Sequence, residues 1–99
     1  MDAKEIAQEL RDILRKYEDF VGLYLYGSYA KGTAGPDSDI DIAAIFEKDR
    51  SSETDVHGET LEIELEHDVI IDFQPTTLEE LNLNWIYFNE VKKGFYYGR

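Results

Sequence analysis

A short run that is apolar on both of its faces, residues 21–26, most constrains how this chain can fold. Side chains alternate between the two faces of an extended strand. The two faces of this run hold Val21, Leu23 and Leu25 on one side and Gly22, Tyr24 and Tyr26 on the other. Apolar or aromatic groups on both sides indicate a strand that other elements cover on both faces.

Helical and strand patterns alternate along the 99 residues. Helices are predicted over 2–17, where Asp2 is the expected N-cap, and over 28–33, 76–81 and 85–92. Strands are predicted over 21–26, 39–46 and 68–74, the last of them stopped by Pro75, while residues 95–97 fit either an edge strand or an apolar tail. The order α-β-α-β-α-β-α predicts an α/β (α+β) fold, a small mixed sheet with helices packed on it. The length predicts a single domain, 1–99.

One segment, residues 51–67, supports two interpretations. Leu61, Ile63 and Leu65 alternate with glutamates, which is a strand pattern. Glu, Leu and Ile dominate the segment as a whole and favour a helix over about 53–66, although Gly58 weakens a helix. We expect the helix.

The charge of the chain is strongly acidic, with 10 basic and 22 acidic residues and a net charge of −12. Such a surface repels nucleic acid phosphates, so no direct nucleic acid partner is expected. It would attract a basic protein partner or a hard cation, or it serves solubility alone. The chain has no cysteine and no apolar run of 18 residues, so we expect a cytoplasmic protein without a membrane segment.

Three aspartates are candidate metal ligands. Asp39 and Asp41 are two apart in a predicted strand and therefore share one face. Asp72 lies in the apolar run 69–73, and it would join them if the two strands are neighbours. Close carboxylates repel one another unless a cation neutralises them, and Mg²⁺ prefers such oxygen ligands. Three carboxylates can hold two metal ions for an in-line displacement.

A phosphate site is predicted at Gly27-Ser28, where a strand turns into a helix. Gly27 permits a close approach of the backbone, and Ser28 is expected to cap the helix, to bind a phosphate oxygen, or both. Lys31 either reaches a triphosphate or is an exposed helix lysine. Ser38 is expected to orient the loop before Asp39 rather than to act as a nucleophile, because no histidine is placed to activate it.

Other polar and aromatic residues receive a structural interpretation. His57 and His67 lack the spacing of a metal-binding pair and are expected at the surface. The late aromatic residues are expected to serve core or interface packing, with base stacking as the minority alternative; they are Trp85, Tyr87, Phe88, Phe95, Tyr96 and Tyr97.

The Gly27-Ser28 pair, ten further residues and then Asp39-x-Asp41 resemble the GS-x10-DxD signature of the minimal nucleotidyltransferases, within the DNA polymerase beta-like superfamily. The resemblance covers most of the chain. It implies a palm-like fold, ATP or another NTP as substrate and Mg²⁺, two ions in the full arrangement, as cofactor. It implies that Gly27, Ser28 and Ser38 contact the nucleotide, with Lys31 in place of the arginine that is common in the family.

The resemblance further implies that Asp39 and Asp41 are metal ligands and that Asp72, the third acid, helps to deprotonate the acceptor. Members of this family are commonly paired with HEPN-domain toxins, and the resemblance implies transfer of AMP to a tyrosine of such a partner. Two alternatives stay open. One is a non-catalytic antitoxin that acts by contact, and the other is a small-molecule nucleotidyltransferase that works as a homo-oligomer.

Overall fold

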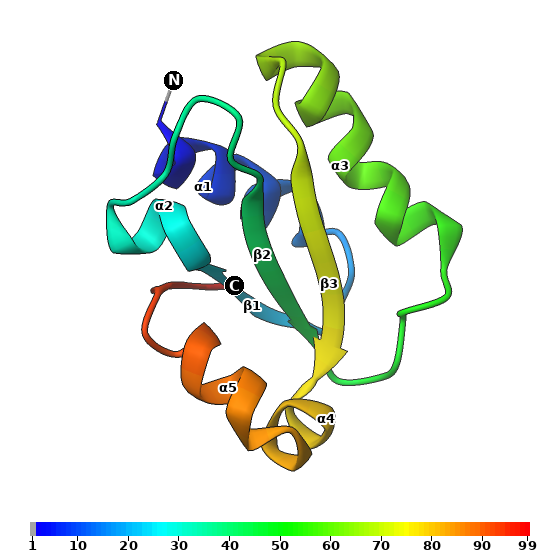
Figure 1. The fold of residues 1–99 in the computed structure, drawn as a ribbon. Coiled ribbons are helices and arrows are strands. Elements are labelled where there is room, and N and C mark those ends of the chain that lie inside the picture. The colour runs from blue at the N-terminus through cyan, green and yellow to red at the C-terminus, as the bar shows by residue number, and fades with distance from the viewer. Residues whose placement is uncertain (1) are drawn as a thin grey trace.

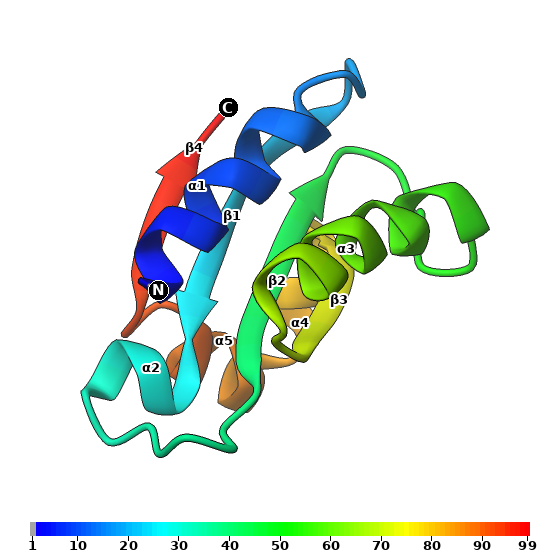
Figure 2. The same cartoon turned by 90° about the horizontal axis from the view of Figure 1, so that it is seen from above.

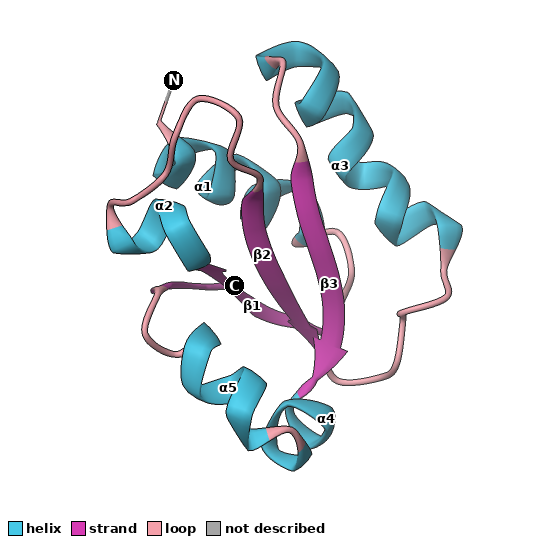
Figure 3. Cartoon of the chain, viewed as in Figure 1, coloured by secondary structure: helices cyan, strands magenta, loops and turns pink. Residues whose placement is uncertain are grey.

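The computed structural model describes residues 2–99 as a four-stranded sheet with five helices (Figure 1, Figure 3). The elements in chain order are α1 (Ala3–Leu14), β1 (Phe20–Tyr26), α2 (Gly27–Lys31), β2 (Ile40–Phe46), α3 (Thr54–His67), β3 (Ile71–Thr77), α4 (Leu78–Leu83), α5 (Trp85–Val91) and β4 (Phe95–Gly98). The predicted fold class is confirmed. The C-terminal aromatic run, left open between two interpretations, forms the edge strand β4.

The sheet has the strand order β3-β2-β1-β4. β1 pairs antiparallel with both β2 and β4, whereas β2 and β3 run parallel, so the sheet is mixed. The parallel pair requires a crossover, which α3 provides. Because β2 and β3 are parallel, the aspartates near the start of each strand meet at the same end of the sheet.

Both faces of the sheet are covered, as the apolar run of β1 predicts. α1 and α3 cover one face (Figure 2), where the larger core includes Leu10, Leu14, Leu23 and Phe46. α4 and α5 lie on the opposite face over a smaller core that contains Ala43, Ile45, Leu81 and Val91. The aspartates of the candidate site belong to this second face, because Asp41 is two residues before Ala43.

The segment with two interpretations, 51–67, forms the helix α3, as expected. Its buried residues are Val56, Thr60 and Ile63, spaced i, i+4 and i+7 as one face of a helix requires. Leu61 and Leu65 point outward and are 57% and 76% exposed. The alternation with glutamates therefore reflects two helical faces rather than a strand.

Two details predicted for the strands were wrong, the end of β3 and the face on which Val21 lies. Pro75 does not end β3 but lies within it, opposite Ala44. Among the strands of residues 2–99, β3 lies at the edge and pairs with β2 alone, so a residue without an N–H is tolerated on its free side. In β1, a register shift between Phe20 and Gly22 places Val21 with the second core, not with Leu23.

Two helix N-caps agree with the sequence. Asp2 accepts a hydrogen bond from the Lys4 N–H at 2.9 Å, although α1 ends at Leu14, three residues earlier than predicted. Thr77 accepts one from the Glu80 N–H at 3.1 Å and starts α4. No helix within residues 2–99 combines the length and apolar character needed to cross a bilayer.

Candidate active site

Three neighbouring strands place a row of polar side chains across one end of the sheet. Asp41 on β2 is paired with Asp72 on β3 and, on its other side, with Tyr26 on β1. Asp39 immediately precedes β2 and is exposed, as is Asp72, whereas Asp41 is half-buried. The structure thus brings the predicted aspartates to one end of the sheet, although Asp72 follows Asp41 by 31 residues in the sequence.

The electrostatics of Asp41 reflect this arrangement. Burial raises the pKa of the Asp41 carboxyl, and the charges of Asp72 and then Asp39 raise it further. Each of these causes disfavours the ionised form, so negative charge on Asp41 is energetically unfavourable in this site. A divalent cation would remove that penalty, and carboxylate oxygens are the ligands that Mg²⁺ prefers. The donor chemistry of the site therefore fits Mg²⁺.

Gly27 is required by both the backbone and the site. Its φ of +73° lies in the left-handed region, which residues with a Cβ rarely adopt. A Cβ built on Gly27 would overlap Oδ2 of Asp41. The absence of a side chain at Gly27 therefore gives the Asp41 carboxylate its place beside the turn.

Ser28 does not cap the helix, and this prediction was wrong. α2 begins at Gly27, so Ser28 lies inside the first turn, and the N-cap is Tyr26, whose side chain makes no capping hydrogen bond. The Ser28 carbonyl accepts from Thr33 N at 2.9 Å and closes the helix at Gly32. The Ser28 hydroxyl is therefore not used as a cap and remains a candidate phosphate contact.

Lys31 lies at the last turn of α2 and is bound to Glu90 of α5. Its Nζ is 3.1 Å from Glu90 Oε2, and both side chains are about half exposed, at 54% and 48%. An exposed pair of this kind contributes little stability. Lys31 can therefore exchange Glu90 for another anion at small cost.

Ser38 orients the loop before β2, as predicted. Its Oγ accepts a hydrogen bond from Gly35 N at 2.9 Å, and its own N–H donates to the Gly35 carbonyl at 3.2 Å. Beside it lies an open hollow of about 430 Å³, lined by Tyr29, residues 36–39 and residues 68–70. The hollow adjoins Asp39 and offers space for part of a ligand next to the aspartates.

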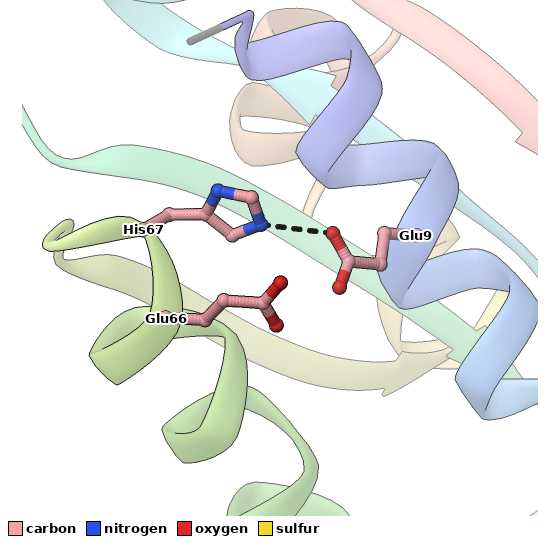
Figure 4. A group of neighbouring side chains, drawn as sticks. All are labelled: Glu9, Glu66 and His67. Carbon is pink, nitrogen blue, oxygen red and sulfur yellow. Dashed lines mark hydrogen bonds and ion pairs between the residues drawn. The ribbon is translucent and has the colours of Figure 1, made fainter.

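A second group of ionisable residues lies between α1 and α3 (Figure 4), the two helices on the face of the sheet opposite to the aspartates. Glu9, Glu66 and His67 each offer one ligand atom, all within 4.8 Å of one another, and His67 Nε2 is 3.0 Å from Glu9 Oε2. Within residues 2–99, this is the group of three possible ligand residues whose ligand atoms all lie within 4.8 Å of one another. The carboxylate oxygens of Asp39, Asp41 and Asp72 do not all lie so close together. His67 is partly exposed, as expected, and joins two helices.

Sequence reasoning missed one feature beside the aspartates, a pair of tyrosines. The hydroxyl oxygens of Tyr26 and Tyr87 are 3.3 Å apart and share a hydrogen bond, although 61 residues separate them. Late aromatic residues were expected in packing, and Tyr87 does pack on the second core. The strand register places Tyr26 beside Asp41, and the packing of α5 brings Tyr87 to Tyr26; the sequence reveals neither.

A mixed sheet with carboxylates on two parallel strands, beside a Gly-Ser turn, is the arrangement that the resemblance to nucleotidyltransferases predicts. A family model described as "Polymerase beta, Nucleotidyltransferase" matches residues 8–91. The chain therefore belongs to the polymerase beta nucleotidyltransferase family and is a nucleotidyltransferase.

Solved structures support the fold. A crystal structure of the toxin–antitoxin MntA-HpeT, in a D39E/D41E mutant form numbered as in that protein, is 20% identical to this chain with a TM-score of 0.68. A crystal structure of the toxin–antitoxin with AMP-PNP is 21% identical with a TM-score of 0.69. In both comparisons the match covers 94% of this chain and 73% of the other. Among curated proteins, no sequence matches this chain significantly.

Proposed function

We propose that this protein transfers AMP from ATP, with Mg²⁺, to a hydroxyl of a partner protein, and that the acceptor is a tyrosine of a HEPN toxin. The observation that carries the proposal is the pairing of Asp41 with Asp72 across parallel strands, next to Gly27. The pairing supports the proposal because it sets two carboxylates beside the turn at which the sequence pattern predicts a triphosphate.

Each residue of the site has a proposed role. Asp39, Asp41 and Asp72 would hold the divalent cation, which when bound neutralises charge on the phosphates. Gly27 and Ser28 would bind the triphosphate at the start of α2, through backbone N–H groups and the Ser28 hydroxyl. Lys31 would leave Glu90 and pair with a phosphate as a point charge, and Ser38 would hold the loop beside the nucleotide.

The transfer step is an in-line displacement. The acceptor oxygen forms a bond to the α-phosphorus, the bond between the α-phosphorus and the bridging oxygen breaks, and pyrophosphate leaves. Asp72 accepts the proton of the acceptor hydroxyl. The residues contribute mainly by positioning the reactants and by stabilising charge.

We propose residues 1–99 as one minimal catalytic domain and a protein as its acceptor, because the two hollows described within residues 2–99 are open to solvent and do not enclose a small molecule. The similar structures come from toxin–antitoxin complexes, one of them with AMP-PNP. The net charge of −12 suits a basic partner such as an RNA-handling toxin.

The test is transfer of radiolabel from [α-³²P]ATP to the protein encoded beside this one, with Mg²⁺ present. We expect labelling by the wild type and its loss in the Asp39→Asn/Asp41→Asn double variant. Asp55→Asn is the matched control, because Asp55 is an exposed aspartate in the first turn of α3, outside the candidate site. Equal labelling by the double variant refutes the proposal. Full neutralisation of the toxin by the double variant would favour the non-catalytic antitoxin instead, and labelling of a small molecule by an oligomer would favour the third alternative.

A further inference from the structure

The tyrosine pair beside the aspartates has no part in the transfer step described above. Tyr26 ends β1 and Tyr87 lies on α5, and their hydroxyl oxygens are 3.3 Å apart. Their rings are nearly perpendicular, at 88°, with centroids 5.9 Å apart. Tyr26 is buried, at 9% exposed, so the pair is a fixed contact between the sheet and α5.

The strand register places Tyr26 directly beside Asp41. Residues opposite each other on adjacent antiparallel strands have Cβ atoms about 4.5–5.5 Å apart and share a face. Asp72 is the partner of Asp41 on the other side, and Gly27 lies close to Asp41 Oδ2. Asp41 therefore has Tyr26, Asp72 and Gly27 as neighbours, and the hydroxyl of Tyr26 is held by its hydrogen bond to Tyr87.

Both hydroxyls remain protonated in this environment. Burial is the largest cause that raises the pKa of Tyr26, followed by the hydrogen bond to Tyr87, and the charges of Asp41 and Asp72 add to it. Burial also raises the pKa of Tyr87, with contributions from Asp72 and Asp41. As neutral groups, the two phenols add no negative charge beside the carboxylates.

We propose that Tyr26 and Tyr87 are positioning residues, whose shared hydrogen bond fixes the Tyr26 ring and thereby holds the Asp41 carboxylate ready for a divalent cation. This inference rests on the proposed function, in which Asp41 is a metal ligand. Supporting contacts around a metal ligand commonly affect metal affinity as well as orientation. A purely structural role for the pair would change stability and leave metal affinity unchanged.

Tyr24 supplies a matched control on the same strand and the same face. It lies opposite Ala43 rather than an aspartate, and its ring packs on Tyr96 with centroids 4.8 Å apart. Tyr24→Phe therefore removes a phenol hydroxyl from the same strand without touching the hydrogen bond beside Asp41.

The experiment is a titration of the protein with Mn²⁺ in the presence of α,β-methylene-ATP, with free Mn²⁺ followed by electron paramagnetic resonance. We expect Tyr26→Phe and Tyr87→Phe each to weaken Mn²⁺ binding by roughly tenfold, the lower end of the effect of contacts that support a metal ligand. The double variant should bind Mn²⁺ no more weakly than the single variant with the lower Mn²⁺ affinity, because both changes remove the same hydrogen bond. Tyr24→Phe should bind like the wild type, and thermal unfolding of each variant checks that it is folded.

The outcomes separate the two proposals. If Asp41→Asn weakens Mn²⁺ binding while the tyrosine variants bind like the wild type, the positioning role is refuted and the proposed function stands. Effects that multiply in the double variant also refute a role through the shared bond. If Asp41→Asn binds Mn²⁺ as well as the wild type, the proposed function itself fails. Because Tyr87 is only half-buried, Tyr87→Phe tests the bond even if Tyr26→Phe does not fold.

Discussion

Replacement of Gly27 by alanine would test how the turn supports the aspartates. The φ of +73° imposes a cost of about 1–2 kcal/mol on any residue with a Cβ. For a domain of this size, we expect the midpoint of thermal unfolding to fall by about 4–16 °C. The new Cβ would also overlap Asp41 Oδ2, so the carboxylate must move away from the turn.

Gly32→Ala isolates the second effect. Gly32 has a φ of +76°, nearly that of Gly27, but a Cβ there would meet nothing within 4 Å. Both variants should therefore lose similar stability by differential scanning calorimetry, whereas only Gly27→Ala should lose Mn²⁺ affinity and AMP transfer. Equal Mn²⁺ affinities for the two variants would refute the reasoning that Gly27 makes room for Asp41.

Three further predictions follow from the charged residues. Because burial and Asp72 raise the pKa of Asp41 above its unfolded value, its ionisation costs stability at neutral pH. Asp41→Asn should therefore raise the unfolding temperature at pH 7, and this gain should shrink as the pH falls below the folded pKa and be lost below the unfolded pKa. Asp19 behaves in the opposite way, because its hydrogen bonds to Arg50 lower its pKa. Asp19→Asn should lower the free energy of unfolding in urea by about 1–3 kcal/mol at pH 7. This loss should shrink as the pH falls through the folded pKa of Asp19, and a loss that does not depend on pH would contradict the prediction. Isothermal titration with Mg²⁺–ATP should give a weaker affinity for Lys31→Ala and an equal or stronger one for Glu90→Gln, which frees Lys31; equal affinities for Lys31→Ala and wild type would exclude a phosphate contact.

The sequence predicted the individual elements of this fold better than their boundaries. Periodicity predicted β1, β2 and the helices, and Asp41 lies at the start of β2 as expected, whereas Asp39 immediately precedes the strand that was predicted to include it. The end of β3 was missed because the tolerance for Pro75 depends on the strand lying at an edge, and edge position is a property of the whole sheet.

The long-range part of the site could not be predicted. That Asp72 faces Asp41 depends on the parallel register of β2 and β3, and that Tyr87 meets Tyr26 depends on where α5 packs. Such pairings depend on tertiary contacts between distant segments, whereas local patterns report only helix or strand. Ser28 was misjudged as a cap for a local reason, since α2 starts one residue earlier, at Gly27.

The central claim, that the aspartates of β2 and β3 bind the metal–nucleotide complex, is tested most directly by locating the metal. Crystals grown with Mn²⁺ and α,β-methylene-ATP, whose bond between the α and β phosphates resists transfer, would give an anomalous difference map at the manganese edge. The account predicts a peak bound by Asp39 and Asp41, with the triphosphate at Gly27 and Ser28. A peak confined to the group of Glu9, Glu66 and His67, or nucleotide bound away from the aspartates, would contradict it.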